Sequence, residues 1–112
     1  MRQGEIWLVN LDPTVGSEIR KTRPALLVND DRLGKLPLKI IVPLTDWKSA
    51  YAQAVWMVRV LPDVENKLLK ESAADAFQVR SVAQERLVRQ LGRVGPDLLR
   101  QVQRALAAVL SI

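Results

Sequence analysis

The chain has 112 residues, enough for one domain spanning residues 1–112, and it contains neither histidine nor cysteine. Disulfides, thiolate metal sites, Ser-His-Asp triads and Cys-His catalytic pairs are therefore excluded. Lysine and arginine outnumber aspartate and glutamate by 17 to 12, and the isoelectric point is about 10.1. Such a basic balance favours a polyanionic partner, which can be nucleic acid, an acidic protein or a membrane surface.

The amino-terminal sequence MRQGEIWLVN has no long apolar region, so we expect no signal peptide. No apolar stretch in the chain approaches the ~20 residues that a membrane-spanning helix needs. We therefore expect a soluble, cytoplasmic protein, and the absence of cysteine is consistent with a reducing compartment.

Four β-rich segments fill the first half of the chain. Turn residues predict a loop that runs from Asp12 to about residue 23. Pro24 suits the first position of a strand, where a missing N–H does least damage. Pro43 predicts that the third strand ends, or lies at an edge, near that residue. The predicted strands cover residues 5–11, 24–30, 38–44 and 54–62.

The second half of the chain predicts two shorter strands and a helix. The segments AFQVRSV (76–82) and RLVRQLGRV (86–94) resemble strands separated by a turn or short helix. From Leu98 to Leu110 apolar residues recur at helical spacing, and Gly95-Pro96-Asp97 is a suitable helix start. Short strands followed by one amphipathic helix predict an α+β fold, a small bent β-barrel or sheet with a helix on it.

The side chains that remain can still support cleavage of RNA. An RNA strand carries its own nucleophile, the ribose 2′-OH, so the protein need only align it, neutralise the phosphate and move two protons. Arginine binds a phosphate through two parallel hydrogen bonds, and a threonine hydroxyl can donate to a phosphate oxygen. A carboxylate with a pKa raised by burial can act as the base.

Several short motifs occur in order along almost the whole chain, and together they resemble the MazF/PemK toxins, the RNA-cleaving components of bacterial toxin–antitoxin pairs. The resemblance implies an SH3-like barrel with a C-terminal helix that forms a homodimer, with RNA in a groove at the dimer interface. It also implies a cognate antitoxin that occupies this groove with an acidic or apolar extended segment. The motifs are Gly4-Glu5-Ile6-Trp7, Asp12-Pro13, Gly16-Ser17-Glu18, Arg23-Pro24, Pro43-Leu44-Thr45, Gln78-Val79-Arg80-Ser81, Arg86-Leu87 and Gly92.

The resemblance implies that Arg23 and Thr45 are the catalytic pair and that Glu18 assists or positions them. Arginine has a pKa above ~12, so stabilising the phosphate is an easier role for Arg23 than accepting a proton. Glu18 is then the better candidate for the proton acceptor, although it can equally be a counter-ion to Arg20 or Lys21.

A second group of residues is expected to bind RNA. Trp47 follows Thr45 in a loop and can stack on an unpaired base, whereas Trp7 and Trp56 are expected in the core. Among the arginines near the end of the chain, the sequence favours only Arg80 as part of a basic groove. The RNA-binding candidates are Arg20, Lys21, Trp47, Gln78 and Arg80.

The activity that the resemblance implies is cleavage of single-stranded RNA, usually mRNA, at a short sequence. The expected products are a 2′,3′-cyclic phosphate or 3′-phosphate and a 5′-OH, with no metal and no cofactor. Three alternatives remain open at this point: a gyrase-poisoning toxin on the same fold, a non-catalytic RNA-binding module, and an inactive relative that acts as a regulatory dimer.

Overall fold

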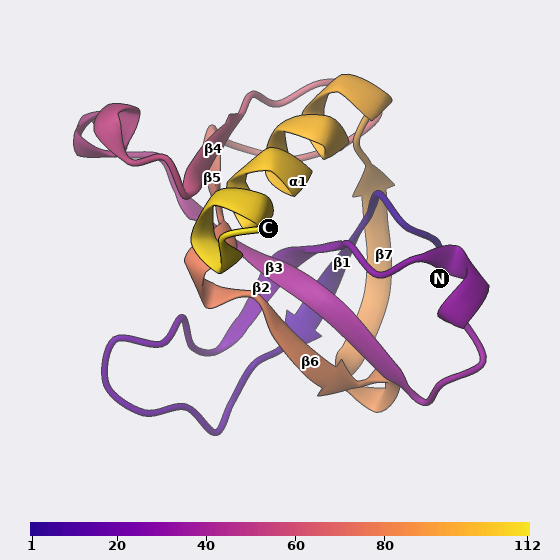
Figure 1. The fold of residues 1–112 in the computed structure, drawn as a ribbon. Coiled ribbons are helices and arrows are strands. Elements are labelled where there is room, and N and C mark those ends of the chain that lie inside the picture. Colours follow the sequence, from indigo (N-terminus) through magenta and orange to yellow (C-terminus); the bar gives the residue numbers. More distant parts are fainter.

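The computed structural model describes all 112 residues as a strongly bent seven-stranded sheet with one long helix across it (Figure 1). The hydrogen-bonded order is β4-β5-β3-β2-β1-β7, and β6 pairs with β3 off this path. The strands are β1 Glu5–Asn10, β2 Thr22–Leu27, β3 Leu38–Asp46, β4 Met57–Val60, β5 Ser72–Asp75, β6 Arg80–Ala83 and β7 Leu87–Arg93. The predicted α+β fold class is confirmed.

The helix α1 covers Pro96–Leu110 and begins as the sequence predicts, with Gly95 at the N-cap and proline in the first turn. Its apolar face, which includes Val102 and Ala105, packs onto a core cluster formed with β1 to β5. A second, smaller cluster around Val9, Leu27 and Ile41 fills the other side of the sheet. None of the helical segments has the length and apolar character needed to cross a bilayer.

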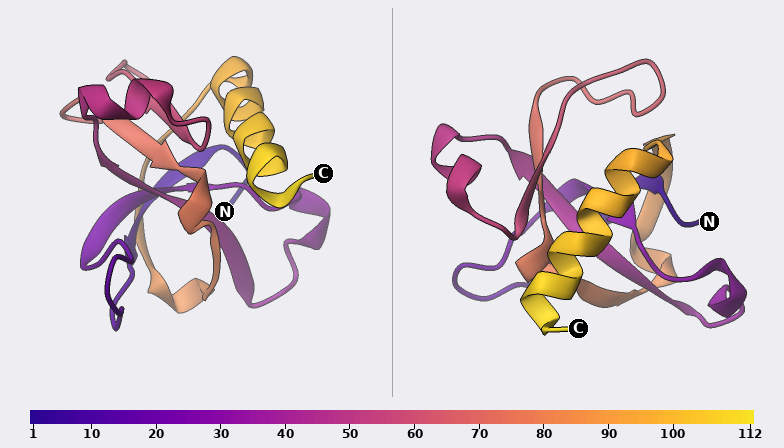
Figure 2. Two further views of the ribbon diagram at one scale, coloured as in Figure 1. Left: turned by 60° about the vertical axis from the view of Figure 1, so that its left-hand side comes forward. Right: turned by 45° about the horizontal axis from the view of Figure 1, so that its top comes forward.

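Four short 3-10 helices connect the strands: η1 Asp31–Leu33, η2 Ser49–Gln53, η3 Ala76–Gln78 and η4 Gln84–Arg86. In Figure 1 the 11–21 loop and η2 project from one side of the sheet, and the 61–71 loop passes beside the start of α1. In both views of Figure 2 these loops lie at a distance from the segment that carries η1. The loops at residues 11–21 and 61–71 matter for the site described below.

β3 continues through Pro43 to Asp46, so the prediction that this strand ends or lies at an edge near Pro43 is wrong. On one side Pro43 pairs with Ala25 of β2. On the other side β6 pairs with residues 38–41 and β5 with residues 44–46, which leaves Pro43 between the two partners. A residue without an N–H is tolerated at such an interruption of the ladder.

Further expectations from the sequence need correction. The strand predicted at 24–30 begins and ends earlier, because β2 covers Thr22–Leu27 and Pro24 is its third residue rather than its first. The predicted strand at 54–62 is shorter, because β4 covers only Met57–Val60. Trp56 therefore precedes the strand and is 40% exposed rather than buried in the core, with its ring 6.4 Å from that of Phe77. Residues 76–78 form η3 instead of a strand. Trp7, as expected, lies in β1 and packs against the smaller core cluster.

Candidate active site

Arg23 and Thr45 lie on adjacent antiparallel strands, β2 and β3, and line the same pocket of about 260 Å³. The printed register pairs Ala25 with Pro43 and Leu27 with Ile41. Continuing this register by two residues places Arg23 opposite Thr45. Residues directly opposite one another in an antiparallel pair project from the same face of the sheet. The register thus brings together the two residues that the sequence predicted as a catalytic pair.

The rim of this pocket carries an excess of positive charge. Four cationic side chains and one carboxylate line it, a net charge of +3 from 4 − 1. The carboxylate of Asp46 is paired with Lys70, whose Nζ lies 3.0 Å from Asp46 Oδ1. The other three cations have no carboxylate within 4.0 Å; they are Arg23, Lys67 and Arg89. Unpaired cations around a hollow attract an anionic ligand such as a phosphate.

Leucine side chains from four different parts of the chain line the same pocket. Together with Pro24 they give the pocket an apolar part beside its cations. These leucines are Leu8 of β1, Leu44 of β3, Leu91 of β7, and Leu68 and Leu69 of the 61–71 loop. An apolar surface with a few converging polar groups is typical of a ligand-binding site.

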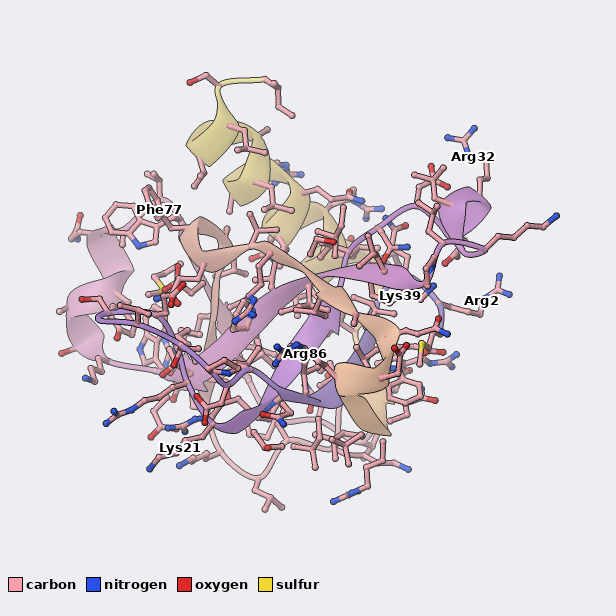
Figure 3. The ribbon with its side chains drawn as sticks, turned by 90° about the horizontal axis from the view of Figure 1, so that it is seen from below. Arg2, Lys21, Arg32, Lys39, Phe77 and Arg86 are labelled. Carbon is pink, nitrogen blue, oxygen red and sulfur yellow. The ribbon has the colours of Figure 1, made fainter.

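Arg23 is half-buried, and its Nε–H donates to the backbone carbonyl of Arg20 at 3.4 Å. The remaining guanidinium N–H groups make no hydrogen bond within the chain and are available to a ligand. Arg20 and Lys21 are both exposed, and Lys21 has the left-handed φ of 71° that turns the loop into β2. Figure 3 shows Lys21 at the outer edge of the molecule. Arg23 is therefore held at the strand start while its two neighbours face solvent.

Gln78 holds the 11–21 loop in place by two hydrogen bonds to its backbone. Its Oε1 accepts the Ile19 backbone N–H at 2.5 Å, and its Nε2 donates to the Ser17 carbonyl at 3.1 Å. Gln78 ends η3, which is capped by the Asp75 carboxylate accepting the Phe77 N–H at 3.1 Å. Burial raises the pKa of Asp75, and hydrogen bonds from Phe77 and Gln78 oppose that shift.

Two arginines hold the beginning of the same loop. Arg80 donates to the Leu11 carbonyl at 3.1 Å, and Arg86 donates to the carbonyls of Asn10, at 3.0 Å, and Asp12. Figure 3 shows Arg86 in the middle of the view, inside the outline of the molecule. Gln78 and Arg80, predicted to bind RNA, thus bind the loop backbone and do not line the pocket of Arg23 and Thr45.

Glu18 is not in this pocket either. It lines a separate depression with Gln78 and Arg80, and its carboxylate accepts the Val15 N–H at 2.5 Å within its own turn. It forms no ion pair with Arg20 or Lys21, so the counter-ion alternative is not what the structure shows. In this arrangement Glu18 stabilises the loop, and the pocket's carboxylate is Asp46.

Comparison with known proteins identifies the chain. Residues 2–110 match the family model described as the PemK-like, MazF-like toxin of type II toxin–antitoxin systems. The chain belongs to this family. A curated relative, endoribonuclease MazF9 of Mycobacterium tuberculosis, is 37% identical over 118 residues, covering 100% of this chain and 98% of the relative.

Solved structures of MazF-like toxins share the fold. The crystal structure of MazF from Deinococcus radiodurans superposes with a TM-score of 0.82 at 24% identity, covering 100% of this chain and 97% of that chain. A mycobacterial endoribonuclease in complex with its cognate antitoxin gives a TM-score of 0.76 at 18% identity, covering 100% of this chain and 96% of that chain. The predicted MazF/PemK resemblance is confirmed.

Trp47 lies in the loop after β3, where the sequence of this MazF-like toxin places it. The Arg59 guanidinium carbon lies 5.2 Å from the centre of its ring, and the Tyr51 ring packs against it edge-on at 5.9 Å. Trp47 lines a groove between η2, β4 and α1, away from the pocket of Arg23 and Thr45. One ring face is therefore already covered by a cation, which leaves at most the other face for a base.

Sequence reasoning missed three cationic residues of the pocket. Lys67 and Lys70 lie in a loop between β4 and β5, and β5 itself was not predicted. Arg89 pairs with Leu8 across β1 and β7, so it reaches the pocket only through the order of strands in the sheet. No local motif marks these residues, and their shared positive charge is the only signal that the sequence carries.

Proposed function

We propose that this chain is an endoribonuclease toxin that cleaves single-stranded RNA at a short sequence, without a metal, and is inhibited by a cognate antitoxin. The observation that carries the proposal is the placement of Arg23 and Thr45 in one cationic pocket. Family membership and the 37% identical relative named as an endoribonuclease support the same conclusion.

In the proposed reaction the ribose 2′-oxygen attacks the adjacent phosphorus and the bond from phosphorus to the 5′-oxygen breaks. The 2′-OH loses its proton to a base, and the 5′-oxygen gains one, giving a 2′,3′-cyclic phosphate and a 5′-OH. Arg23 binds the non-bridging oxygens as negative charge builds on them, and the Thr45 hydroxyl donates a further hydrogen bond. The role proposed for Arg23 is therefore electrostatic, since its guanidinium presents several N–H donors to the phosphate and no acceptor.

On this proposal the chain forms a homodimer. Several large apolar side chains are exposed in the single chain, among them Trp56 (40%), Phe77 (68%) and Val55 (71%). A second copy that covers them would remove apolar surface from water, which is the usual driving force for association. The cationic and partly apolar pocket of Arg23 and Thr45 is also suited to an antitoxin segment that is acidic or apolar and extended, which would exclude RNA.

The decisive test is incubation of the purified protein with a long RNA in the presence of EDTA, followed by sequencing of the fragment 5′ ends. We expect cuts at one short motif with 5′-OH ends that polynucleotide kinase labels directly. Intact RNA at high protein excess would contradict the proposal. A gyrase-poisoning toxin would instead leave RNA intact and inhibit DNA supercoiling by gyrase, and a non-catalytic module would bind RNA without cutting it.

Variants of the pair separate chemistry from binding. Arg23→Ala and Thr45→Val should each lower kcat about 100- to 1,000-fold, as expected for the loss of one donor to a transition-state anion. Thr45→Ser, which keeps the hydroxyl, should retain most activity. Arg2→Ala serves as the control, because Arg2 is an exposed arginine that Figure 3 shows on the side of the molecule opposite Lys21.

A further inference from the structure

We propose that the pocket beside Arg23 and Thr45 holds one nucleotide adjacent to the cleaved bond, and that Lys67 and Arg89 select its base. The 61–71 loop, which carries Lys67, would then determine where the RNA is cut. This inference rests on the proposed function, because it assigns the specificity of the same site.

The pocket has the size and lining that a single base requires. Its volume of about 260 Å³ lies just below the ~300–1,000 Å³ of small-molecule sites, which is room for one base rather than several. The leucines of its surface offer an apolar contact to the flat face of an unpaired base. Because Arg23 and Thr45 line the same pocket, the base that enters it belongs to a nucleotide next to the phosphate they contact.

Lys67 and Arg89 give the pocket a chemical preference. Both are free of acidic partners, and both side chains carry hydrogen-bond donors only. Donors favour a base edge rich in acceptors, such as O6 and N7 of guanine or the carbonyls of uracil. The exocyclic amino groups of adenine and cytosine would face these cations without a partner. We therefore expect guanine or uracil at this position.

The 61–71 loop is rigid enough to act as one wall of a selective pocket. Asn66 is only 2% exposed, and its Oδ1 accepts the N–H groups of Asp63 and Leu68, both at 3.0 Å. Its Nδ2 donates to the Leu61 carbonyl at 2.8 Å. A loop that is already ordered loses little conformational entropy when the ligand binds, and it holds its polar groups in a fixed geometry.

The same loop is anchored to the sheet at Gly92 of β7. A Cβ on Gly92 would lie 2.6 Å from the Asn66 carbonyl oxygen and nearer still to that of Glu65, so loop backbone occupies the space of a side chain. The Arg93 N–H donates to the Glu65 carbonyl at 3.1 Å. These contacts join the loop to the strand that also supplies Arg89, so both selecting residues belong to one rigid unit.

The test is selection from a random-sequence RNA pool in which every 2′-OH is replaced by fluorine, so that the strand cannot be cut. The full-length protein, Lys67→Gln, Arg89→Gln and the control Lys35→Gln are each used for selection. Glutamine is chosen because it removes the charge and keeps a long side chain. Lys67 has a φ of 55°, so a change to glycine would also relieve backbone strain and confuse the result. Lys35 is an exposed, unpaired lysine in the segment that follows η1, outside this pocket.

We expect the wild-type protein to enrich guanine or uracil at least tenfold at one position next to the cut identified in cleavable RNA. Lys67→Gln or Arg89→Gln should reduce this preference below threefold at that position and leave the others unchanged. Lys35→Gln should retain it. Unchanged preference in both variants, an equal loss at every position, or no wild-type preference would overturn the inference. Because the pool cannot be cleaved, failure of the nuclease proposal would appear separately, as intact natural RNA.

Discussion

The ammonium group of Lys70 lies 3.0 Å from the carboxylate of Asp46, at the pocket rim and one residue beyond Thr45. Both side chains are more than half exposed, so the pair contributes at most ~1 kcal/mol to folding. Its larger effect is on charge. Asp46 is the single carboxylate that faces the space where a phosphate would bind, and it neutralises one of the four cations there.

Asp46→Asn should therefore strengthen RNA binding. Removing the carboxylate frees Lys70 and removes a repulsive charge, so we expect KM for RNA to fall about threefold at low salt, with the difference vanishing at high salt. The measurement is steady-state cleavage at two ionic strengths. Asp97→Asn is the control, because Asp97 is an exposed carboxylate paired with Arg100 on α1 and outside the pocket. A rise in KM for Asp46→Asn would contradict this electrostatic role.

Gln78 should hold the 11–21 loop in place through its two hydrogen bonds to the loop backbone. Gln78→Ala removes two hydrogen bonds to that loop, each worth about 0.5–1.5 kcal/mol. We expect hydrogen exchange at the Ile19 amide to accelerate about tenfold or more, while exchange in the core strands is unchanged. Gln103→Ala, at an exposed position on α1, provides the control. Unchanged protection at Ile19 would show that the loop is held by other contacts.

Much of the fold follows from local sequence, and the exceptions have tertiary causes. The residues around Ile40 and Val42 form a strand as their β-branched side chains predict, and Pro96 starts the helix. β5 was missed because Ser72–Asp75 contains no β-branched or aromatic residue. It is a strand because β3 and β4 pair with it on either side, and all four residues are buried.

The residues of the site also fall into some that local sequence predicts and others that depend on tertiary packing. Arg23 and Thr45 are recognisable because each belongs to a motif of the family, and the β2–β3 register brings them together. Lys67 and Arg89 belong to no motif. Their position depends on the close packing of a loop against Gly92, which no local pattern reveals. Gln78 was identified, but as an RNA ligand, because a motif names a residue without saying which way its side chain points.

Gly92 does not line the pocket, but Gly92→Ala should alter the pocket by displacing the 61–71 loop. The new methyl group would collide with loop carbonyls, so either the loop moves or the protein loses about 1–3 kcal/mol of stability. We expect a lower midpoint of urea unfolding together with a weaker base preference in RNA cleavage. Gly95→Ser is the control, since a Cβ there meets nothing within 4 Å and serine is a favoured residue at a helix N-cap. Wild-type stability and specificity in Gly92→Ala would mean that the loop does not depend on this contact.

Asp75 should make stability depend on pH. The residue is 6% exposed, and burial raises the pKa of its carboxyl above the usual value for aspartate. The folded state therefore binds this proton more tightly than the unfolded state does. The resulting stabilisation is complete at pH values below the pKa of the unfolded state. It is lost as pH rises through the pKa of the folded state, so at neutral pH the ionised carboxylate destabilises the fold.

Asp75→Asn removes the buried negative charge and keeps a carbonyl oxygen to accept the Phe77 N–H. We expect the variant to gain stability relative to wild type at pH 7 and to lose that advantage at pH 3, as measured by urea unfolding at both values. Glu85→Gln, at an exposed carboxylate without an ion pair, should show the same small difference at both pH values. If Asp75→Asn were instead less stable at pH 7 than at pH 3, relative to wild type, the hydrogen bonds from η3 would outweigh burial at this carboxylate.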